Sequence, residues 1–398
     1  MKRSFIFIAI ALVLVGLIYL GIFGLEEDSP SSGNDLQSGG NQNQSSYEQT
    51  FTHIHSWQEA TCVLAKHCKN CAVEEGEPLG HDYLNGACSR CGELLYLREG
   101  NFIYFGSYPQ SVVTDEGVLA RLNAIVGELP TAQNFGEWIG YGYYILSQKQ
   151  SFAWYNDVEL EGEKYRAVYY TKYRPFSTDR SSIETQCFQD ENGYAVNSIY
   201  WFKFEPIKWR ILRELDGELF LLSNLILDSR EFYTHDSQRR IDENSSYIYP
   251  NNYAHSTLRS WLNGEFYNLA FGKDHSALIS TAFVLNEQGS TGTESNPYVC
   301  ENTNDKVFLL SYSDSMNTKH GFYSDKDRQL GITDYALSQG GATREVEGKI
   351  FGYWWLRSPF YSKEEITLSI NANGEIENSG SVNSTGCGVA PAIKIKLS

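Results

Sequence analysis

The sequence is poor in basic residues and in proline. It holds 32 Lys and Arg against 49 Asp and Glu, which gives a formal net charge of −17 at pH 7. Nucleic-acid affinity comes largely from cations that neutralise phosphates, so this charge argues against a nucleic-acid partner. Only 10 of the 398 residues are proline, against 34 glycines, which excludes proline-rich and collagen-like architectures.

The common catalytic motifs are also absent. The chain has no G-x-S-x-G, H-E-x-x-H, Walker or G-x-G-x-x-G pattern, so we assign no catalytic residue from the sequence. Aromatic residues, in contrast, are abundant: they make up 14% of the chain and include 27 Tyr and 21 Phe. So much apolar side-chain area does not stay in water, which excludes a disordered chain and predicts a folded protein.

The longest apolar stretch lies near the amino terminus. Residues 4–25 carry no charge and would span about 33 Å as a helix, enough to cross a hydrocarbon core of ~30 Å. Lys2 and Arg3 precede it, so we predict a cytoplasmic tip and transmembrane signal-anchor over 1–25, with the rest outside the cell membrane. A cleaved signal peptide is the alternative, but its apolar region is ordinarily only ~7–15 residues long. No second stretch is as apolar, which predicts a single pass.

Residues 26–52 are dominated by Ser, Gly, Asn and Gln. Such a segment cannot bury a core, so we predict a flexible polar linker that holds the folded part away from the bilayer. No cysteine precedes Cys62. This excludes a lipid-modified cysteine at a signal-peptide cleavage site.

Residues 53–96 hold five of the eight cysteines. Four of them form the pattern C-x2-C-x16-C-x2-C, which is typical of a zinc ribbon. Two residues between thiolates let one tight turn offer both sulfurs to a metal, and two such turns complete a tetrahedron. We therefore predict a small zinc-ribbon-like module with a structural zinc ion. The predicted ligands are Cys68, Cys71, Cys88 and Cys91.

Disulfide bonds are the alternative for this module, because it would face an oxidising exterior. Cys62 favours a metal, because disulfides would leave a fifth cysteine over. A half-repeat is visible as well: six residues separate His55 from Cys62, and six separate His81 from Cys88. The histidines could replace a ligand or support one. The module resembles a recurring pattern of bacterial surface proteins, in which H-x-W, T-C and C-x-x-C are followed by G-x-x-L-G-H and a second C-x-x-C.

From residue 97 onward, short β-rich runs alternate with turn signals. Asp216-Gly217 separates two such runs and predicts a two-residue hairpin turn, and Asn373-Gly374 predicts another. Apolar residues at i, i+3 and i+4 over 258–262 predict a short helix, with Ser256 as its N-cap and Asn263-Gly264 as its end. Strands outnumber helices, so we predict an α+β domain.

Six motifs in this region carry a resemblance. They are Tyr104-Phe-Gly-Ser-Tyr-Pro-Gln110, Ile207-Lys-Trp-Arg210, Leu258-Arg-Ser-Trp-Leu-Asn263, Val307-Phe-Leu-Leu-Ser311, Trp354-Trp-Leu-Arg-Ser-Pro359 and Gly388-Val-Ala-Pro-Ala-Ile393. The series resembles an uncharacterised bacterial extracellular domain family, which is similar to the C-type-lectin-like fold of formylglycine-generating enzymes and variable receptor-type proteins. The resemblance implies a strand-rich, C-type-lectin-like domain over 97–398, with one or two packed helices and an insertion at about 148–200. Ala390 departs from the pattern, which more usually has arginine there.

The C-terminal part also offers a candidate ligand site. An aromatic face beside a guanidinium can stack on a sugar ring or clamp a carboxylate. In this fold type, loops near the carboxyl end often form the ligand surface. We therefore predict ligand binding by Trp354, Trp355, Arg357 and Tyr361. The alternative is that both tryptophans belong to the core and that Arg357 fixes a loop.

The sequence offers two further kinds of candidate site. The segments Asn302 to Asp305 and Asn371 to Glu375 have oxygen atoms at the density that calcium sites need, although a hairpin turn explains the second and an ordinary loop would explain the first. Formylglycine-generating chemistry needs a cysteine pair. Because Cys300 and Cys387 are far apart in sequence, we do not transfer that activity. These two and Cys187 are interpreted as buried small hydrophobes, or as one disulfide plus a spare.

Together these features predict a membrane-anchored, extracytoplasmic binding or interaction protein that recognises a peptide or a cell-wall glycan. The absence of a catalytic motif favours binding over catalysis. The alternatives are an ectoenzyme, either a carboxylate-dependent hydrolase or a cysteine-dependent oxidase, and a purely structural envelope protein.

Overall fold

The structure, a computed structural model, describes residues 54–84, 86–131, 136–145, 148–176, 188–234 and 247–397. The chain divides into the units Met1–Ser56 and Trp57–Ser398, and the described helices and strands belong to the second. The predicted signal-anchor and linker lie outside the described residues. Within the described ranges, no helix is long and apolar enough to cross a membrane.

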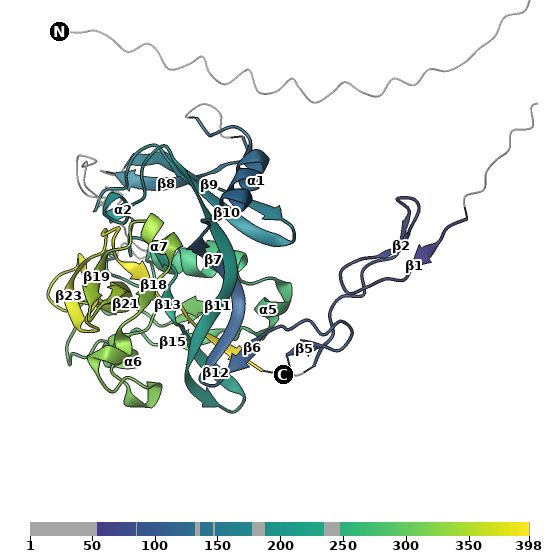
Figure 1. Cartoon of the computed structure of the whole chain (residues 1–398). Coiled ribbons are helices and arrows are strands. Elements are labelled where there is room, and N and C mark those ends of the chain that lie inside the picture. Colours follow the sequence, from purple (N-terminus) through teal and green to yellow (C-terminus); the bar gives the residue numbers. More distant parts are fainter. Residues whose placement is uncertain are drawn as a thin grey trace, which may run out of the picture. The chain divides into compact units, whose positions relative to one another are not determined.

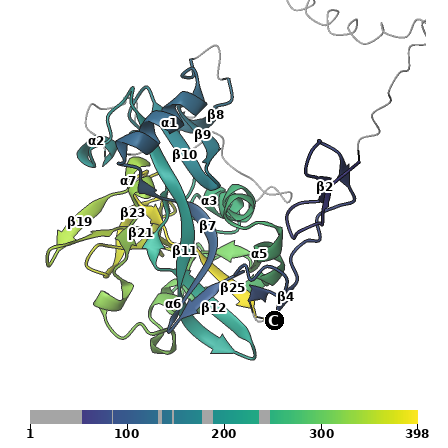
Figure 2. The same cartoon turned by 45° about the vertical axis from the view of Figure 1, so that its right-hand side comes forward.

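The large domain is built on a nine-stranded antiparallel sheet. Its strands are β6 (Leu97–Glu99), β7 (Phe102–Val112), β8 (Ile139–Ile145), β9 (Gln148–Leu160), β10 (Glu163–Tyr170), β11 (Ile199–Leu215), β12 (Glu218–Ser223), β17 (Val307–Phe308) and β25 (Ala392–Lys396). Strand β11 pairs with β7, β10 and β12. Figures 1 and 2 show β11 running through the middle of the domain beside β7.

The hairpin predicted at Asp216-Gly217 is confirmed. Strands β11 and β12 pair in antiparallel fashion across these two residues. Asp216 has a φ of 52° and Gly217 a φ of 75°, and a type I′ turn requires positive φ at both positions. The segment 148–200, interpreted from the sequence as an insertion, supplies β9 and β10 to the same sheet.

A five-stranded sheet carries the C-terminal motifs in the order β14-β24-β21-β22-β23. Its strands are β14 (Asp228–Ser229), β21 (Trp354–Pro359), β22 (Ile366–Ile370), β23 (Ile376–Ser381) and β24 (Gly388–Val389). The second predicted hairpin is confirmed, because β22 and β23 pair across Asn373-Gly374 and Gly374 has a φ of 86°. As the last strand in this order, β23 forms an edge of the sheet among the described residues.

Short helices connect the strands. They are α1 (Glu116–Val126), α2 (Phe188–Glu191), α3 (Thr257–Trp261), the π-helical turn η1 (Leu262–Phe266), α4 (Tyr267–Ala270), α5 (Lys273–Leu278), α6 (Tyr312–Ser315) and α7 (Asp334–Ser338), with 3₁₀ turns η2 (Gln288–Ser290), η3 (Thr318–His320) and η4 (Asp325–Arg328). The predicted N-cap is confirmed, because the Ser256 side chain accepts a backbone N–H of α3. The predicted end at Asn263-Gly264 is wrong: the helical path continues through η1 into α4. The Asn263 side chain accepts the N–H groups of Lys306 and Val307, so it fixes the helical segment to β17 instead of ending it.

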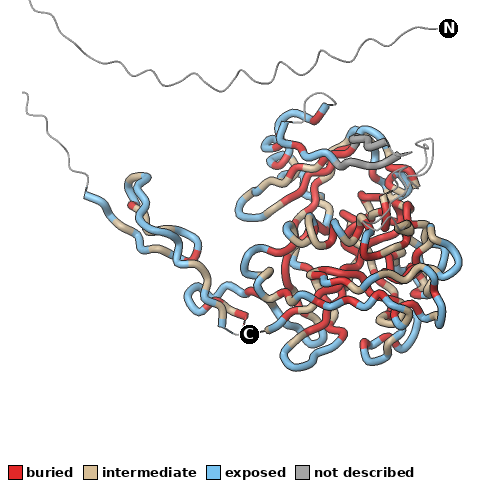
Figure 3. Tube along the Cα trace, turned by 180° about the vertical axis from the view of Figure 1, so that it is seen from behind, coloured by how far each residue is buried: buried red, intermediate tan, exposed pale blue. Residues whose placement is uncertain are grey.

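The cysteine module contains only short strands. They are β1 (Trp57–Gln58), β2 (Lys66–Cys68), β3 (Glu74–Glu75), β4 (Tyr83–Leu84) and β5 (Ala87–Cys88). Its buried hydrophobic residues are Cys62, Cys68, Cys88 and Leu95, and most of its trace is exposed or half-buried in Figure 3. A module that buries so little apolar area needs a further source of stability, such as a metal or a disulfide.

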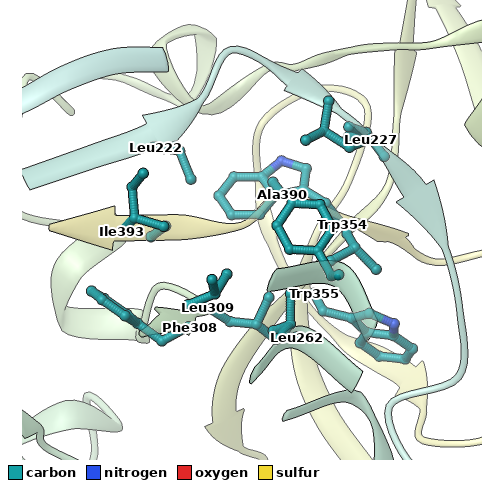
Figure 4. Close-up of a cluster of buried hydrophobic side chains, with 14 of the residues drawn as sticks. Leu222, Leu227, Leu262, Phe308, Leu309, Trp354, Trp355, Ala390 and Ile393 are labelled. Carbon is teal, nitrogen blue, oxygen red and sulfur yellow. The ribbon is translucent and has the colours of Figure 1, made fainter. Parts of the chain in front are cut away.

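Three two-stranded pairs complete the described strands. They are β13 (Leu225–Ile226) with β18 (Gly331–Ile332), β15 (Ala282–Val284) with β16 (Thr303–Asp305), and β19 (Thr343–Val346) with β20 (Lys349–Gly352). Most buried hydrophobic residues form one core, in which Trp354 and Trp355 pack near Leu262 and Leu309 (Figure 4). A smaller cluster around Trp154 includes buried residues of α1. The prediction of a strand-rich α+β domain is thus confirmed at this level.

Candidate functional site

Four potential metal ligands meet in the cysteine module. The ligand atoms of Cys62, His81, Cys88 and Cys91 all lie within 4.8 Å of one another, and we call these four residues the metal cluster. The Sγ atoms of Cys62 and Cys88 are 3.7 Å apart, and His81 Nδ1 lies 3.5 Å from the Cys91 Sγ. Tetrahedral zinc with Zn–S bonds of ~2.3 Å separates its ligand atoms by about 3.8 Å, whereas a disulfide bond is about 2.05 Å long. The spacing fits a four-coordinate metal and not a disulfide.

Backbone pairing brings Cys62 to the cluster. Two N–H···O bonds, of 2.8 and 3.1 Å, join Thr61-Cys62 to Leu79-Gly80. The next residue is His81, so this pairing sets Cys62 beside the imidazole. Cys88 and Cys91 follow on one tight turn, which is closed by a bond of 2.8 Å from the residue after Cys91 to the Cys88 carbonyl.

The surroundings of Cys88 favour its thiolate form. Burial alone would raise the pKa of this thiol, but the backbone N–H groups of Asp82, Cys91 and Arg90 outweigh burial and lower the pKa of Cys88 to about 5. For Cys62, burial and hydrogen bonds to Cys91 and Cys88 raise the pKa to about 11. A metal ion replaces thiol protons when it binds, so it would bring both sulfurs to the ionised form.

His81 has the surroundings of a metal ligand. Its Nδ1 faces the sulfurs, while its Nε2 lies 3.4 Å from a Glu93 carboxylate oxygen. A carboxylate on the far nitrogen is the usual partner of a metal-bound histidine, because it fixes the tautomer and the ring orientation. Tyr83 stacks on the ring, with centroids 5.3 Å apart. Four protein ligands would close the coordination shell of zinc, which indicates a structural role.

Two of the four ligands predicted from the spacing lie in the metal cluster. Cys88 and Cys91 belong to it, whereas Cys68 and Cys71 lie together in the first C-x-x-C turn, outside the cluster. The spacing of cysteines records only their separation along the chain, and it contains no information on the backbone pairing that brings Cys62 to His81. The half-repeat and the fifth cysteine were the sequence signals for this alternative.

The structure places both predicted tryptophans in the core. Trp354 and Trp355 are 0% exposed. Their indole N–H groups donate to the carbonyl oxygens of Arg328 and Arg230, at 3.1 and 2.7 Å. Figure 4 shows both rings among aliphatic side chains. Neither tryptophan therefore presents a face to a ligand. The alternative interpretation, in which both belong to the core, describes their position.

Arg357 is buried and holds loops together. Its guanidinium donates to the carbonyl oxygens of Leu309 at 2.6 Å and Leu285 at 3.1 Å, and to the Asp314 carboxylate at 2.8 Å. Burial would raise the pKa of Asp314, but the positive charge of Arg357 and hydrogen bonds from Ser311 outweigh it and lower that pKa. All three nitrogens of Arg357 have partners within the domain.

Tyr361 is the predicted ligand residue that reaches the surface. It is 52% exposed and lines a cleft of about 640 Å³, which we call the Tyr361 cleft. The Tyr312 and Phe360 rings line the same cleft, and the Phe360 and Tyr361 ring centroids are 4.9 Å apart. Residues of α6, η4, the loop after β21 and the β22–β23 hairpin form its walls. The cleft therefore combines loops that are distant in sequence.

Carboxylates line the Tyr361 cleft as well. They are Asp325, Glu375 and Glu377. The Asn371 amide donates to both glutamates, at 2.9 Å to Glu375 and 2.7 Å to Glu377. Hydrogen bonds from Asn371, and then from Asn373, lower the pKa of Glu375, so this side chain stays charged at neutral pH. Aromatic rings next to ionised carboxylates favour ligands that carry positive charge or many hydroxyl groups.

Residues 216–397 match the family DUF6273, a domain of unknown function. The matched residues contain the whole Tyr361 cleft and four of the six motifs of the sequence resemblance, whereas the metal cluster precedes them. The match agrees with the expectation of an uncharacterised domain family. No curated protein and no solved structure matches the chain.

Cys300 and Cys387 do not have the surroundings of reactive thiols. They form no disulfide, and Cys187 lies outside the described residues. Burial raises the pKa of Cys300 to about 11 and that of Cys387 well above its usual value. Both sulfurs thus stay protonated at neutral pH, whereas a nucleophilic or copper-binding cysteine acts as a thiolate.

The oxygen-rich segments use their oxygens internally. Asp305 pairs with Arg259, with a nitrogen–oxygen distance of 2.6 Å, and the Asn302 side-chain oxygen accepts a backbone N–H. The Asn371 side-chain oxygen accepts the N–H groups of Asn373 and Glu375, which closes the hairpin turn. Turn geometry therefore accounts for the second segment, as the sequence suggests.

Proposed function

We propose that the protein is a membrane-anchored, extracytoplasmic binding protein that takes a peptide or a cell-wall glycan in the Tyr361 cleft. The observation that carries the proposal is the combination of three aromatic rings and three carboxylates around about 640 Å³ of open space. Ligand sites typically unite apolar walls with a few polar groups that fix orientation. An open cleft on one side of the domain suits a segment of a long polymer.

The location rests on the sequence. The predicted signal-anchor over 1–25 would hold the protein in the membrane, and the linker over 26–52 would give the cleft reach from its surface. A C-type-lectin-like architecture is part of the proposal, supported by the motif series and by the strand-rich domain. In that fold type the loops near the carboxyl end often bind ligands, and Tyr361 lies on such a loop.

We also infer that the metal cluster binds zinc. Three thiolates and one imidazole form a ligand set typical of structural zinc. The ion would hold the two halves of the module together, because Cys62 comes from the first half and the other ligands come from the second. The module would then act as a stable spacer between linker and large domain.

Binding of the full chain, in detergent micelles, to peptide and cell-wall glycan arrays tests the proposed function. Tyr361→Ala should weaken binding about tenfold, because an aromatic contact contributes on the order of 1 kcal/mol and the side chain also forms the wall. Tyr323→Ala is the control, since Tyr323 is 78% exposed and does not line the cleft. Absence of binding on both arrays would contradict the proposal and favour a structural envelope protein.

A carboxylate-dependent hydrolase is the second candidate, because Glu375 and Glu377 share the Asn371 amide inside the cleft. Glycosidases use two carboxyl groups, one of which is an acid with a raised pKa. The pKa of Glu375 is lowered, so Glu375 does not have the raised pKa that the acid of a glycosidase needs. New reducing ends from cell-wall glycan, lost in Glu377→Gln, would favour the hydrolase. Binding without cleavage would favour the binding protein.

A further inference from the structure

The edge strand β23 lies between two cavities. It pairs with β22 on one side, and it is the last strand in the order of its sheet among the described residues. Figure 1 shows it, in yellow, at the margin of the domain. At an edge, every second residue of a strand directs its N–H and C=O groups away from the sheet, and these groups can pair with another chain.

Register shows that the two cavities lie on opposite faces of this sheet. Ser369 of β22 stands opposite Glu377 of β23, and Ile370 stands opposite Ile376. Directly opposed residues share a face, and successive residues of a regular strand alternate. A register shift between Thr367 and Ser369 adds a residue to β23, so the alternation is taken from β22. Leu368 lines the Tyr361 cleft, whereas the next residue, Ser369, lines a second cavity of about 300 Å³, which we call the Cys387 pocket. Glu377 borders both cavities.

The Tyr361 cleft suits a basic side chain. The cationic residue in the lining of this cleft is Arg328, which is 4% exposed. Its Nε donates to the Gly374 carbonyl at 2.8 Å, and its terminal nitrogens donate to the Ser315 carbonyl and the Asp325 carboxylate. That guanidinium is therefore already used by the fold. The carboxylates of the cleft leave an excess of negative charge next to aromatic rings, and this combination attracts ammonium and guanidinium groups.

The Cys387 pocket suits an uncharged side chain. Phe188, Ala342, Tyr353 and the protonated Cys387 line it, together with small residues of β22 and β23. Its one carboxylate is Glu377, whose two oxygens accept hydrogen bonds from Asn371 at 2.7 Å and Ser379 at 3.0 Å. A small apolar residue would fit this chemistry.

We infer that an extended peptide adds to β23 as a further strand and places a basic residue in the Tyr361 cleft and the next, uncharged residue in the Cys387 pocket. This inference rests on the proposed function and names its ligand class. Strand addition gains affinity from main-chain hydrogen bonds and specificity from pockets for alternate side chains. A peptide is favoured over a glycan, because a sugar chain has no regular series of N–H and C=O groups to pair with an edge strand.

Synthetic eight-residue peptides in which Lys and Val alternate are the probe, with the full chain in detergent micelles. N-methylation of every second amide removes donors without a change of charge. We expect one methylation register to weaken binding at least about tenfold, because several hydrogen bonds are lost, and the other register to leave it nearly unchanged. Hydrogen exchange at the amides of 376–381 should slow when the unmethylated peptide binds.

Side-chain specificity is tested separately. Glu375→Gln should weaken the Lys–Val peptide several-fold more than a Gln–Val peptide. Glu159→Gln removes the same charge from an exposed position of β9 and should change neither. Equal effects of both methylation registers, with unchanged exchange over 376–381, would overturn strand addition while the proposed binding function stands. Binding of cell-wall glycans but of no peptide would likewise overturn strand addition and leave the proposed binding function standing. Binding of neither peptides nor glycans would overturn strand addition and the proposed function together.

Discussion

Arg357 illustrates how much of a residue's role depends on its surroundings. From the sequence, an arginine after two tryptophans suggests a ligand clamp. In the folded chain its guanidinium is satisfied by two carbonyl oxygens and by Asp314. Residue type records what a side chain is able to bind, whereas burial decides what reaches it. Tyr361, in contrast, lies on a loop and is exposed, so its ring is within reach of a ligand.

Replacement of Arg357 should destabilise the domain. Arg357→Met leaves Asp314 without its cation, and loss of one partner of a buried ion pair costs about 3–5 kcal/mol. The free energy of unfolding from urea titration at pH 7 measures this effect. Arg98→Met is the matched control, because the Arg98–Glu214 pair is exposed and contributes at most about 1 kcal/mol. Equal losses in the two variants would contradict the role assigned to Arg357.

The same pair predicts a pH dependence. The pKa of Asp314 is lowered in the folded protein, so the unfolded chain binds a proton more readily. The stabilisation is therefore complete above the ordinary carboxyl pKa of about 4 and is lost as the pH falls through the lowered value. Between pH 7 and 3, Asp314→Asn should flatten the acid branch of the stability curve. An unchanged acid branch would show that other carboxylates determine it.

The metal cluster gives a further prediction at this scale. Cys62→Ser removes one of four ligands, and we expect zinc affinity to fall by more than about a hundredfold, because loss of a mere supporting group already costs 10–100-fold. Zinc that resists a competing chelator, counted per full chain, should drop by one. Cys300→Ser should leave it unchanged. A disulfide at Cys62 in the unreduced protein would contradict the assignment.

At the scale of elements, signals within a few residues predicted turns and a helix cap correctly. Features that depend on contacts between distant parts of the chain could not be predicted from the sequence. The turns at Asp216-Gly217 and Asn373-Gly374 are encoded by residues that need positive φ, and the Ser256 cap is encoded by its own side chain. The end predicted at Asn263-Gly264 failed, because a contact with β17, more than forty residues away, holds the helical path together. The order of the nine strands depends on such contacts throughout, and no periodicity in the sequence contains it.

The two hairpin glycines should respond differently to alanine. A Cβ on Gly217 would meet open space, so Gly217→Ala costs only the strain of positive φ, about 1–2 kcal/mol. A Cβ on Gly374 would collide with the Asp325 backbone carbonyl, so Gly374→Ala should cost about 1–3 kcal/mol more. Thermal unfolding of the two variants measures the difference. Equal shifts in Tm would contradict the close approach of η4 to the β22–β23 turn.

At the scale of the whole molecule, charge connects the proposals. The protein has a net charge of −17, and the Tyr361 cleft has the same sign. A field of one sign raises the rate at which opposite charges arrive, and salt weakens this effect. A basic peptide would therefore be attracted both by the whole surface and by the cleft. The sequence predicts this sign from composition alone, but the position of the cleft required the folded chain.

The side of the membrane on which the large domain lies is the last prediction. Tyr323 is exposed, so Tyr323→Cys offers a thiol for a membrane-impermeant maleimide. Because Lys2 and Arg3 favour a cytoplasmic amino terminus, this variant should gain label on intact cells beyond that of the unaltered protein. Lys2→Cys should gain label only after the cells are permeabilised. The opposite result for the pair would place the Tyr361 cleft in the cytosol, where cell-wall glycans are out of reach and the proposed role fails.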